Sequence, residues 1–397
     1  MRGPFQHGII IGGGIAGPLL AIFLKRIGTS SVVYEAQEQR AESTAGLQIA
    51  PNGMHVLAAL GLADEVRRQG MVASHFHFRN HKGKTLALVR NGDASVYGQP
   101  SVMLSRSLLH RIVTEAAARA GIRIEYGKTF RRLYPDIGVT AEFEDGSSTH
   151  GDFLIGADGL HSRVREFIAL DSRPQHTGLI GLGGFVPRSA FRSHIEPDES
   201  ALTMTFGPGG FFGYGNCGTS QGPVTLWWSN LPSDRTNPEL AGLPCDDIRS
   251  ELMRVHRGWH GPFESLIATS PVILRNAIYD MPNLPAWHRG RVALVGDAAH
   301  AMSPHSGQGA SIAMEDAMYL AKVMSADPAT AFARYEQERR PRVERINEQS
   351  RRNGHRKKLK NPASVWMRDR LLCVLLPAFL ERGQDWIFRY RIDQAHS

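Results

Sequence analysis

The clearest pattern of apolar and polar positions lies at the start of the chain. Residues 8–24 carry no charge, and three consecutive glycines, Gly12 to Gly14, interrupt them. The short apolar segment Gly8–Ile11 predicts a buried strand, and the apolar stretch Ile15–Arg26 predicts a helix. A β-branched segment at 31–36 predicts a second strand. The uncharged stretch is therefore interpreted as strand, turn and helix, not as a signal peptide or membrane anchor.

The glycine spacing in this unit is typical of a dinucleotide-binding turn. Gly12, Gly14 and Gly17 form the pattern G-x-G-x-x-G, with Ile15 and Ala16 between the last two. The first glycine of such a unit makes the tight turn, and the second lets the backbone approach a pyrophosphate. The third allows close packing of helix on strand, and the helix N-terminus faces the phosphates.

An acidic residue completes the unit. Glu35 follows Gly17 by 18 residues, near the spacing of about 20 at which an acid binds the ribose. The alternative, a Gly-rich turn followed by an exposed glutamate, explains fewer of these features. The unit predicts a dinucleotide site but does not separate NAD from FAD.

Two later segments repeat the change from apolar strand to turn to helix. Phe153–Glu166 predicts a buried strand that breaks at Asp158-Gly159 and passes into a helix. Trp287–Met324 predicts a strand ending at Gly296-Asp297, a Pro/Gly loop and a long helix from about Gly309.

Each of these residues also has a plainer interpretation. Asp158 would simply be a turn residue, because Asp-Gly is common in hairpins. Asp297 would cap a helix, and His300 and His305 are expected to be loop histidines whose rings bond to the backbone. For the two aspartates, their order along a chain that already has a dinucleotide unit favours a cofactor site.

Strand-like segments lie between the cofactor segments. Met71–Val89 alternates around the turn Lys82-Gly83, and Leu179–Pro232 predicts several antiparallel strands with Gly-rich turns. We expect these strands to form a sheet inserted into an α/β domain, where it would supply a wall opposite the cofactor.

Aromatic residues on these strands are candidates for contact with a substrate. Phe212 and Tyr214 share one face by the period of two, and we name both as candidate substrate-binding residues, together with Trp228 and Pro304. Core packing is expected for most aromatic residues of this region. Tyr214 and His305 are weak catalytic candidates, and no residue can be named as a substrate-activating base.

Composition narrows the class of protein. The chain has 397 residues, of which 42% are hydrophobic and 21% charged, which argues against intrinsic disorder and fibrous architectures. Its three cysteines, Cys217, Cys245 and Cys373, are far apart, and no Cys/His cluster has metal-ligand spacing. We expect no bound metal and a cytoplasmic location.

A charged run and an apolar run near the C-terminus bear on whether the protein binds nucleic acid, a membrane or a second copy of itself. Much of the formal net charge of +8 falls in Arg339–Lys360, where the helical spacing predicts a solvated helix face and no motif indicates nucleic-acid binding. The apolar run Leu371–Leu380 is too short to span a membrane. Val365–Ile392 is expected to pack as a helix along the domain interface, with membrane-surface or dimer contact as alternatives. We expect the protein to be a monomer or a homodimer.

On these residues the chain resembles the class A flavoprotein monooxygenases, FAD-dependent aromatic hydroxylases of the para-hydroxybenzoate hydroxylase type. The resemblance covers roughly residues 8 to 345, with anchors in the family order: the three glycines, Glu35, the segment 46–62, Arg106, Asp158-Gly159 and Gly296-Asp297. It implies an α/β fold with a Rossmann-like FAD-binding domain at 1–71, 102–175 and 281–345. An antiparallel β-sheet substrate domain would be inserted at 72–101 and 176–280, and 346–397 would be a C-terminal helical segment.

The resemblance also implies roles for single residues. Glu35 would bind the adenosine ribose of FAD, Arg106 would lie by the pyrophosphate, and Asp297 would hold the ribityl chain. Asp158 would stabilise a turn that touches FAD. The family often has Asn where this chain has Ser311. The expected cofactor-binding residues are Gly12, Gly14, Ile15, Ala16, Gly17, Glu35, Gly46, Arg106, Asp158, Gly296, Asp297, Pro304, Gly307, Gln308, Gly309 and Ala310.

The implied reaction is hydroxylation of an electron-rich aromatic or polycyclic small molecule. NADH or NADPH would reduce FAD, and molecular oxygen would reach the substrate through a flavin hydroperoxide. The choice between NADH and NADPH is open, because the sequence has no second nucleotide-binding motif whose residues would indicate which of the two is bound. The alternatives are an oxidase or dehydrogenase without oxygen insertion, a halogenase, and a flavin-binding protein without turnover. The W-x-W-x-I-P pattern of the halogenases is absent from the sequence.

Overall fold

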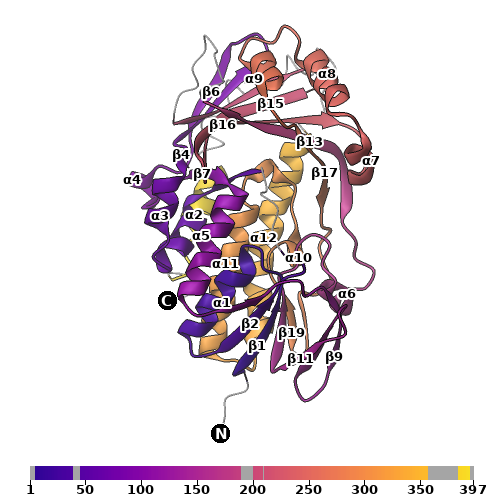
Figure 1. The fold of residues 1–397 in the computed structure, drawn as a ribbon. Helices are drawn as coiled ribbons and strands as arrows, with labels where there is room; N and C mark the ends of the chain where they lie inside the picture. The colour runs from indigo at the N-terminus through magenta and orange to yellow at the C-terminus, as the bar shows by residue number, and fades with distance from the viewer. Residues whose placement is uncertain (1–4, 39–44, 189–199, 209, 356–382, 394–397) are drawn as a thin grey trace.

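The computed structural model describes residues 5–38, 45–188, 200–208, 210–355 and 383–393. Two sheets dominate it, a six-stranded sheet at the bottom of Figure 1 and a ten-stranded sheet at the top. Helices α11 (Gly309–Ala326) and α12 (Ala331–His355) lie beside the lower sheet, and α12 continues upward to the larger one.

The lower sheet is parallel except at one edge. Its order is β18 (His288–Arg289), β19 (Val292–Leu294), β12 (Phe153–Gly156), β1 (His7–Ile11), β2 (Ser30–Tyr34) and β8 (Arg123–Glu125). Ile9 of β1 lies opposite Val32 and Leu154. Only β18 runs antiparallel to its neighbour. The central strands are apolar because both faces of the sheet are covered, and the predicted strand-turn-helix-strand unit is confirmed.

Helix α1 (Ala16–Arg26) packs tightly on this sheet and against α11. Leu19, Leu20 and Leu24 are fully buried in the same core as Ile9. A Cβ at Gly17 would clash with the carbonyl oxygen of Gly12. The third glycine of the motif therefore acts in helix–strand packing, as predicted.

The larger sheet is mixed. Its main path is β17 (Leu274–Asp280), β13 (Gln175–Pro187), β16 (Gly222–Pro232), β15 (Gly210–Thr219), β14 (Ala201–Gly207), β5 (His75–Asn80) and β6 (Thr85–Arg90). Strands β3 (Gly46–Ile49), β4 (Met71–Val72) and β7 (Val102–Ser105) extend it. The neighbours β5 and β14 are parallel, which corrects the expectation of a purely antiparallel sheet. They are far apart in sequence, so no hairpin constrains their direction.

Helices cover the outer face of the larger sheet, and a second core lies beneath them (Figure 1). These helices are α7 (Asn237–Gly242), α8 (Cys245–His256) and α9 (Phe263–Thr269). Phe212 stacks on Trp227 with ring centroids 5.2 Å apart and meets Phe263 edge-on at 4.8 Å. Tyr214 belongs to the same core.

The remaining elements are a smaller third sheet, which packs on the parallel sheet, and further helices. A three-stranded sheet consists of β9 (Phe130–Pro135), β10 (Val139–Phe143) and β11 (Ser148–Gly151). The other helices are α2 (Pro51–Ala59), α3 (Ala63–Gln69), α4 (Ala94–Tyr97), α5 (Arg106–Arg119), α6 (Val164–Ile168), α10 (Asp297–His300) and the 3₁₀ turn η1 (Pro304–Ser306). The domain boundaries given above stay a prediction.

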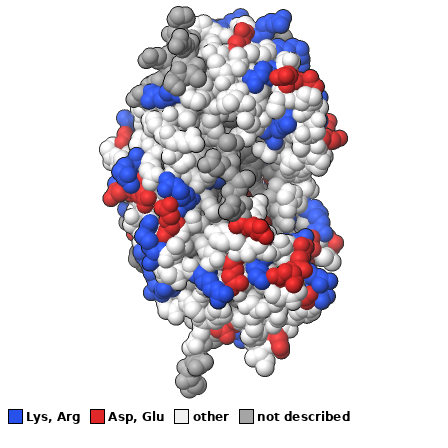
Figure 2. All heavy atoms as spheres, in the orientation of Figure 1, with Lys and Arg blue, Asp and Glu red and all other residues white. Residues whose placement is uncertain are grey.

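Within the described ranges, no helix is both long and apolar enough to cross a membrane. No group of His, Cys, Asp or Glu side chains there could hold a metal ion. On the face in Figure 2, described Lys and Arg side chains are interspersed with Asp and Glu. Cys373 and the run 371–380 lie outside the described residues; of the segment expected to pack as a C-terminal helix, 383–388 is helical.

Candidate functional site

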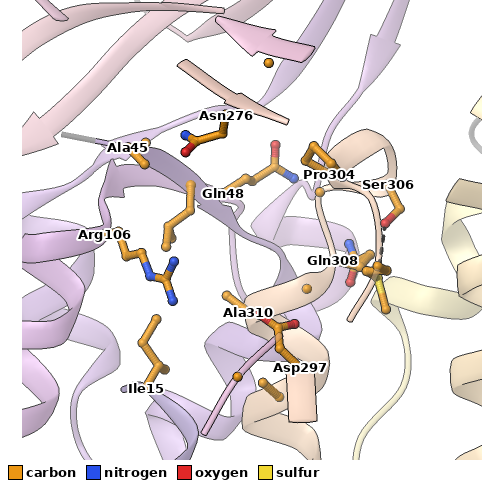
Figure 3. A pocket seen from close by; sticks show the side chains of 18 of the residues that line it. Ile15, Ala45, Gln48, Arg106, Asn276, Asp297, Pro304, Ser306, Gln308 and Ala310 are labelled. Carbon is orange, nitrogen blue, oxygen red and sulfur yellow. Dashed lines mark hydrogen bonds between the residues drawn. The ribbon is translucent and has the colours of Figure 1, made fainter. Parts of the chain in front are cut away.

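One cavity of about 880 Å³ lies between the parallel sheet and the larger sheet. In Figure 3, Ile15 and Asp297 lie toward one end of the view and Asn276 toward the other, with Gln48 between them. Expected cofactor residues that line it are Gly12, Gly14, Ile15, Ala16, Glu35, Gly46, Arg106, Asp158, Asp297, Pro304, Gly307, Gln308, Gly309 and Ala310. Gly17 and Gly296 are not among its lining residues: Gly17 lies in α1, where it allows close packing, and Gly296 precedes Asp297 in the turn after β19.

The glycine turn after β1 brings backbone up to the cavity. Gly12 has a φ of 113°, and a Cβ there would clash with the backbone of Ala157, so only glycine fits. Helix α1 starts directly afterwards, with Ile15 as its N-cap residue. No side chain caps its first turn and no acid stands in it. Its N–H groups and positive dipole end suit a phosphate.

Glu35 is fixed at the end of β2, beside this turn. Its Oε2 accepts a hydrogen bond from the N–H of Gly13 at 2.7 Å, and its Oε1 accepts one from the N–H of Gln37 at 3.0 Å. An ionised carboxylate has about four acceptor positions. Glu35 thus keeps acceptor capacity for a ribose hydroxyl at a set place.

Arg106 supplies a positive charge to the same region. It is the first residue of α5, whose N-cap Ser105 accepts a hydrogen bond from the N–H of Leu108 at 3.2 Å. Figure 3 shows the guanidinium inside the cavity, on the same side as Ile15. A guanidinium near an uncapped helix start suits a pyrophosphate.

Asp158 holds the turn between β12 and α6. Its Oδ2 accepts hydrogen bonds from the N–H groups of Arg163 at 2.8 Å and Val164 at 3.2 Å. Loss of water around its carboxyl raises the pKa of Asp158. Gly159 completes the turn with a φ of 77°. The turn borders the cavity, so its shape depends on this carboxyl.

Asp297 projects from the turn after β19. Gly296 precedes it with a φ of 59° and donates its N–H to Oδ2 of Asp316 at 3.0 Å. Asp297 begins α10, but no side chain caps that helix. The helix-cap interpretation is therefore not supported, and the carboxyl of Asp297 is exposed to the cavity.

A buried charge network stands behind this turn, which the sequence interpretation missed. Asp316 also accepts a hydrogen bond from Nε2 of His300 at 2.6 Å, so the expectation that the His300 ring bonds to the backbone is wrong. Arg339 pairs with Asp316 at 3.0 Å and with Glu315 at 2.7 Å, and all three side chains are almost fully buried.

This network corrects the interpretation of Arg339–Lys360 as a solvated helix face for two of its arginines, whereas Arg352 of the same helix is exposed. Arg339 is fully buried, and Arg342 is 8% exposed and pairs with Glu315. Burial alone would raise the pKa of Glu315, but Arg342 and Arg339 hold it below its ordinary value. Two adjacent acids in the apolar stretch 309–326 were the signal in the sequence, since buried acids require partners.

The network reaches the loop before α11 through Asn52. Its Nδ2 donates to Oε1 of Glu315 at 2.6 Å and to Oε1 of Gln308 at 3.1 Å. Ser311 is also buried, and its Oγ accepts a hydrogen bond from the N–H of Ala50 at 3.2 Å. Both contacts tie the loop that carries Gln308 to α2.

The other end of the cavity is apolar. Trp228, Pro304 and His305 line it, but Phe212 and Tyr214 do not. Those two were named as substrate contacts, and Tyr214 also as a catalytic candidate; both are corrected, because their strand directs them into the core beneath α8 and α9. Further lining residues are Phe76, Phe78, Met103, Gly181, Gly183, Leu202, Met204, Phe206, Phe211, Leu226, Ser229, Asn230, Asn276 and Ile278.

A glycine turn lies at an uncapped helix start, one carboxylate follows the next strand, and a second carboxylate lies at the same end of the cavity. This arrangement is that of a protein that binds a dinucleotide, and these residues fit FAD. The chain belongs to the FAD binding domain family, whose profile matches residues 7–350. The resemblance to the class A flavoprotein monooxygenases is confirmed.

The chain is similar to several characterised proteins along nearly its whole length. It is 33% identical over 392 residues to a 3-amino-4-hydroxybenzoate 2-monooxygenase of Streptomyces platensis, covering 97% of this chain and 96% of that protein. It is 32% identical over 376 residues to an aurachin C monooxygenase/isomerase of Stigmatella aurantiaca, covering 92% and 93%. The structure of Klebsiella pneumoniae HpxO complexed with FAD and uric acid has a TM-score of 0.82, 28% identity and coverage of 98% and 96%. This chain is an FAD-dependent monooxygenase.

Proposed function

We propose that this enzyme uses NADH or NADPH and molecular oxygen to hydroxylate an electron-rich aromatic or polycyclic molecule. The observation that carries the proposal is one continuous cavity, which joins a dinucleotide site to an apolar wall of the larger sheet. Relatives of this chain are named for oxidation of ring compounds, including an aminohydroxybenzoate and a hydroxynicotinate.

The residues on the parallel-sheet side bind and orient FAD in this proposal. The N-terminus of α1 and Arg106 hold the pyrophosphate, Glu35 accepts a ribose hydroxyl, and Asp297 accepts one from the ribityl chain. Bound FAD supplies the redox chemistry, taking electrons from the nicotinamide and activating oxygen.

The loop before α11 positions the flavin ring. Pro304, Gly307, Gln308 and Gly309 line the cavity, and Gln308 is held by Asn52. Helix α11 begins at Gly309 without a side-chain cap. Its positive end would stabilise negative charge on the adjacent edge of the ring.

The apolar wall excludes water from the reacting centre. Trp228 and its neighbours on the larger sheet place hydrocarbon and ring carbon around the substrate. Exclusion of water protects an activated oxygen species from wasteful breakdown to hydrogen peroxide. We also propose a cytoplasmic location, because a reduced nicotinamide is required and the described cysteines, Cys217 and Cys245, are free.

The test is consumption of NADH or NADPH by purified holoenzyme across a panel of phenols, naphthols and hydroxyquinolines. The expected result is slow oxidation alone, stimulation by at least one compound, and a product heavier by one oxygen atom. Stimulated oxidation with only hydrogen peroxide and unchanged compound, across the panel, would support the oxidase alternative instead.

A further inference from the structure

The described part of the wall that the larger sheet contributes to the cavity has no Lys, Arg, Asp or Glu side chain. The described residues that line the cavity from the main path of the larger sheet lie on β5, β13, β14, β15, β16 and β17. Each of their side chains is apolar or a neutral polar group. The polar groups are Ser229, Asn230 and Asn276. Ser229 already donates its hydroxyl to the carbonyl of Phe211 at 2.8 Å, and Asn230 is buried. Asn276 alone of these three has an exposed side chain.

The cations of the cavity lie elsewhere. Arg106 starts α5 beside the glycine turn. Lys128 pairs with Asp145 at 2.6 Å, and Arg163 pairs with Glu144 at 2.5 Å, both outside the larger sheet. None of these cations belongs to the wall that faces the substrate in the proposed function.

One glycine widens this wall, and a second is required by close packing, because a Cβ at Gly183 would lie 2.9 Å from the carbonyl oxygen of Trp227. Gly181 and Gly183 of β13 both line the cavity, and residues two apart on a strand point to the same face. A Cβ at Gly181 would have its nearest neighbour, Ile278, at 3.6 Å, an ordinary contact. The fold therefore does not require glycine at 181; the missing side chain leaves space for a flat ring system.

We propose that the substrate is an uncharged aromatic molecule of at least two fused rings. A carboxylate taken out of water against this wall would meet no Lys or Arg side chain among the described residues that line it, and an unpaired buried charge is strongly unfavourable. The free amide of Asn276 offers a hydrogen bond to a phenol or ring carbonyl instead. This inference rests on the proposed function and names its substrate class; it separates the chain from the benzoate named for its Streptomyces platensis relative.

The test is a pair of ligands with the same ring system and hydroxyl, 2-naphthol and 3-hydroxy-2-naphthoate, of which only the second carries a carboxylate. Their binding to holoenzyme is titrated through the flavin absorbance, without reductant. The naphthol should bind at least tenfold more tightly. Equal or tighter binding of the naphthoate, or binding of neither compound, would overturn the inference. Because no turnover is measured, failure here is distinct from failure of the proposed function, which the oxygenation assay reports.

Three variants sharpen this result. Asn276→Arg places a cation on the wall and should raise naphthoate affinity about tenfold, whereas Val272→Arg, at an exposed position outside the cavity lining, should leave it unchanged. Gly181→Leu should weaken 2-naphthol at least tenfold and phenol much less, with FAD content unchanged. Equal losses for phenol and naphthol would contradict the requirement for fused rings.

Discussion

The two ends of the cavity are built in opposite ways. The end near the parallel sheet has carboxylates, a guanidinium and backbone N–H groups, held by hydrogen bonds such as that from Gly13 to Glu35. The end at the larger sheet has rings, aliphatic side chains and glycines. A charged cofactor suits the first kind of surface, and the uncharged substrate that we propose suits the second. Substitutions at the parallel-sheet end should therefore change the affinity for the cofactor, and substitutions at the larger-sheet end should change the affinity for the substrate.

The largest effect is expected where the charged end is supported. Arg339→Met would leave Glu315 and Asp316 buried without their shared cation. Removing one partner of such a group costs about 3–5 kcal/mol of unfolding free energy. Urea denaturation of the apoprotein measures it. The control is Arg352→Met on the same helix, whose pair with Glu348 is exposed and should contribute at most about 1 kcal/mol. Equal, small losses would show that the buried network is dispensable.

Asp297→Ala should act on the cofactor alone. Loss of a charge-assisted hydrogen bond to FAD costs about 1.5–3 kcal/mol, or roughly ten- to a hundredfold in affinity. Titration of apoprotein with FAD measures this loss, and the KM for the aromatic substrate at saturating FAD should change little. Asp234→Ala, an exposed aspartate on the sheet side, is the control. Unchanged FAD affinity in folded Asp297→Ala would place that carboxyl outside the FAD site.

A smaller difference in stability and KM is expected between substitutions of two aromatic residues of the larger sheet. Phe212→Leu alters the core beneath α8 and α9, so it should lower unfolding free energy by about 1 kcal/mol and leave KM unchanged. Trp228→Leu alters the cavity wall, so it should raise KM several-fold with less loss of stability. Thermal unfolding and steady-state kinetics on both variants test the division. The reverse pattern would refute the assignment of strand faces.

The cofactor end was predictable from sequence because local rules govern it. A glycine spacing, a strand end and an Asp-Gly turn each constrain a few adjacent residues, and Gly12, Glu35 and Asp297 all line the cavity. The period of two placed Phe212 and Tyr214 on one face, but it could not show which face meets the cavity. That choice depends on where α8 and α9 pack, which is a matter of long-range contacts.

The buried network escaped prediction for a related reason. Arg339 and its neighbours have the composition of a solvated helix, and only the position of α12 against α11 buries them. The parallel pairing of β5 with β14 likewise joins segments far apart in sequence, where no turn type sets the direction. Sequence patterns therefore predicted the helices and strands more fully than they predicted which helices and strands pack or pair with one another.

The most direct test of the central claim is turnover under isotopically labelled oxygen gas with an aromatic compound that stimulates NADH or NADPH oxidation. We expect one labelled oxygen atom in the product for each nicotinamide consumed at full coupling. A product that carries oxygen only from water, or a dehydrogenated product formed while oxygen becomes hydrogen peroxide, would contradict it.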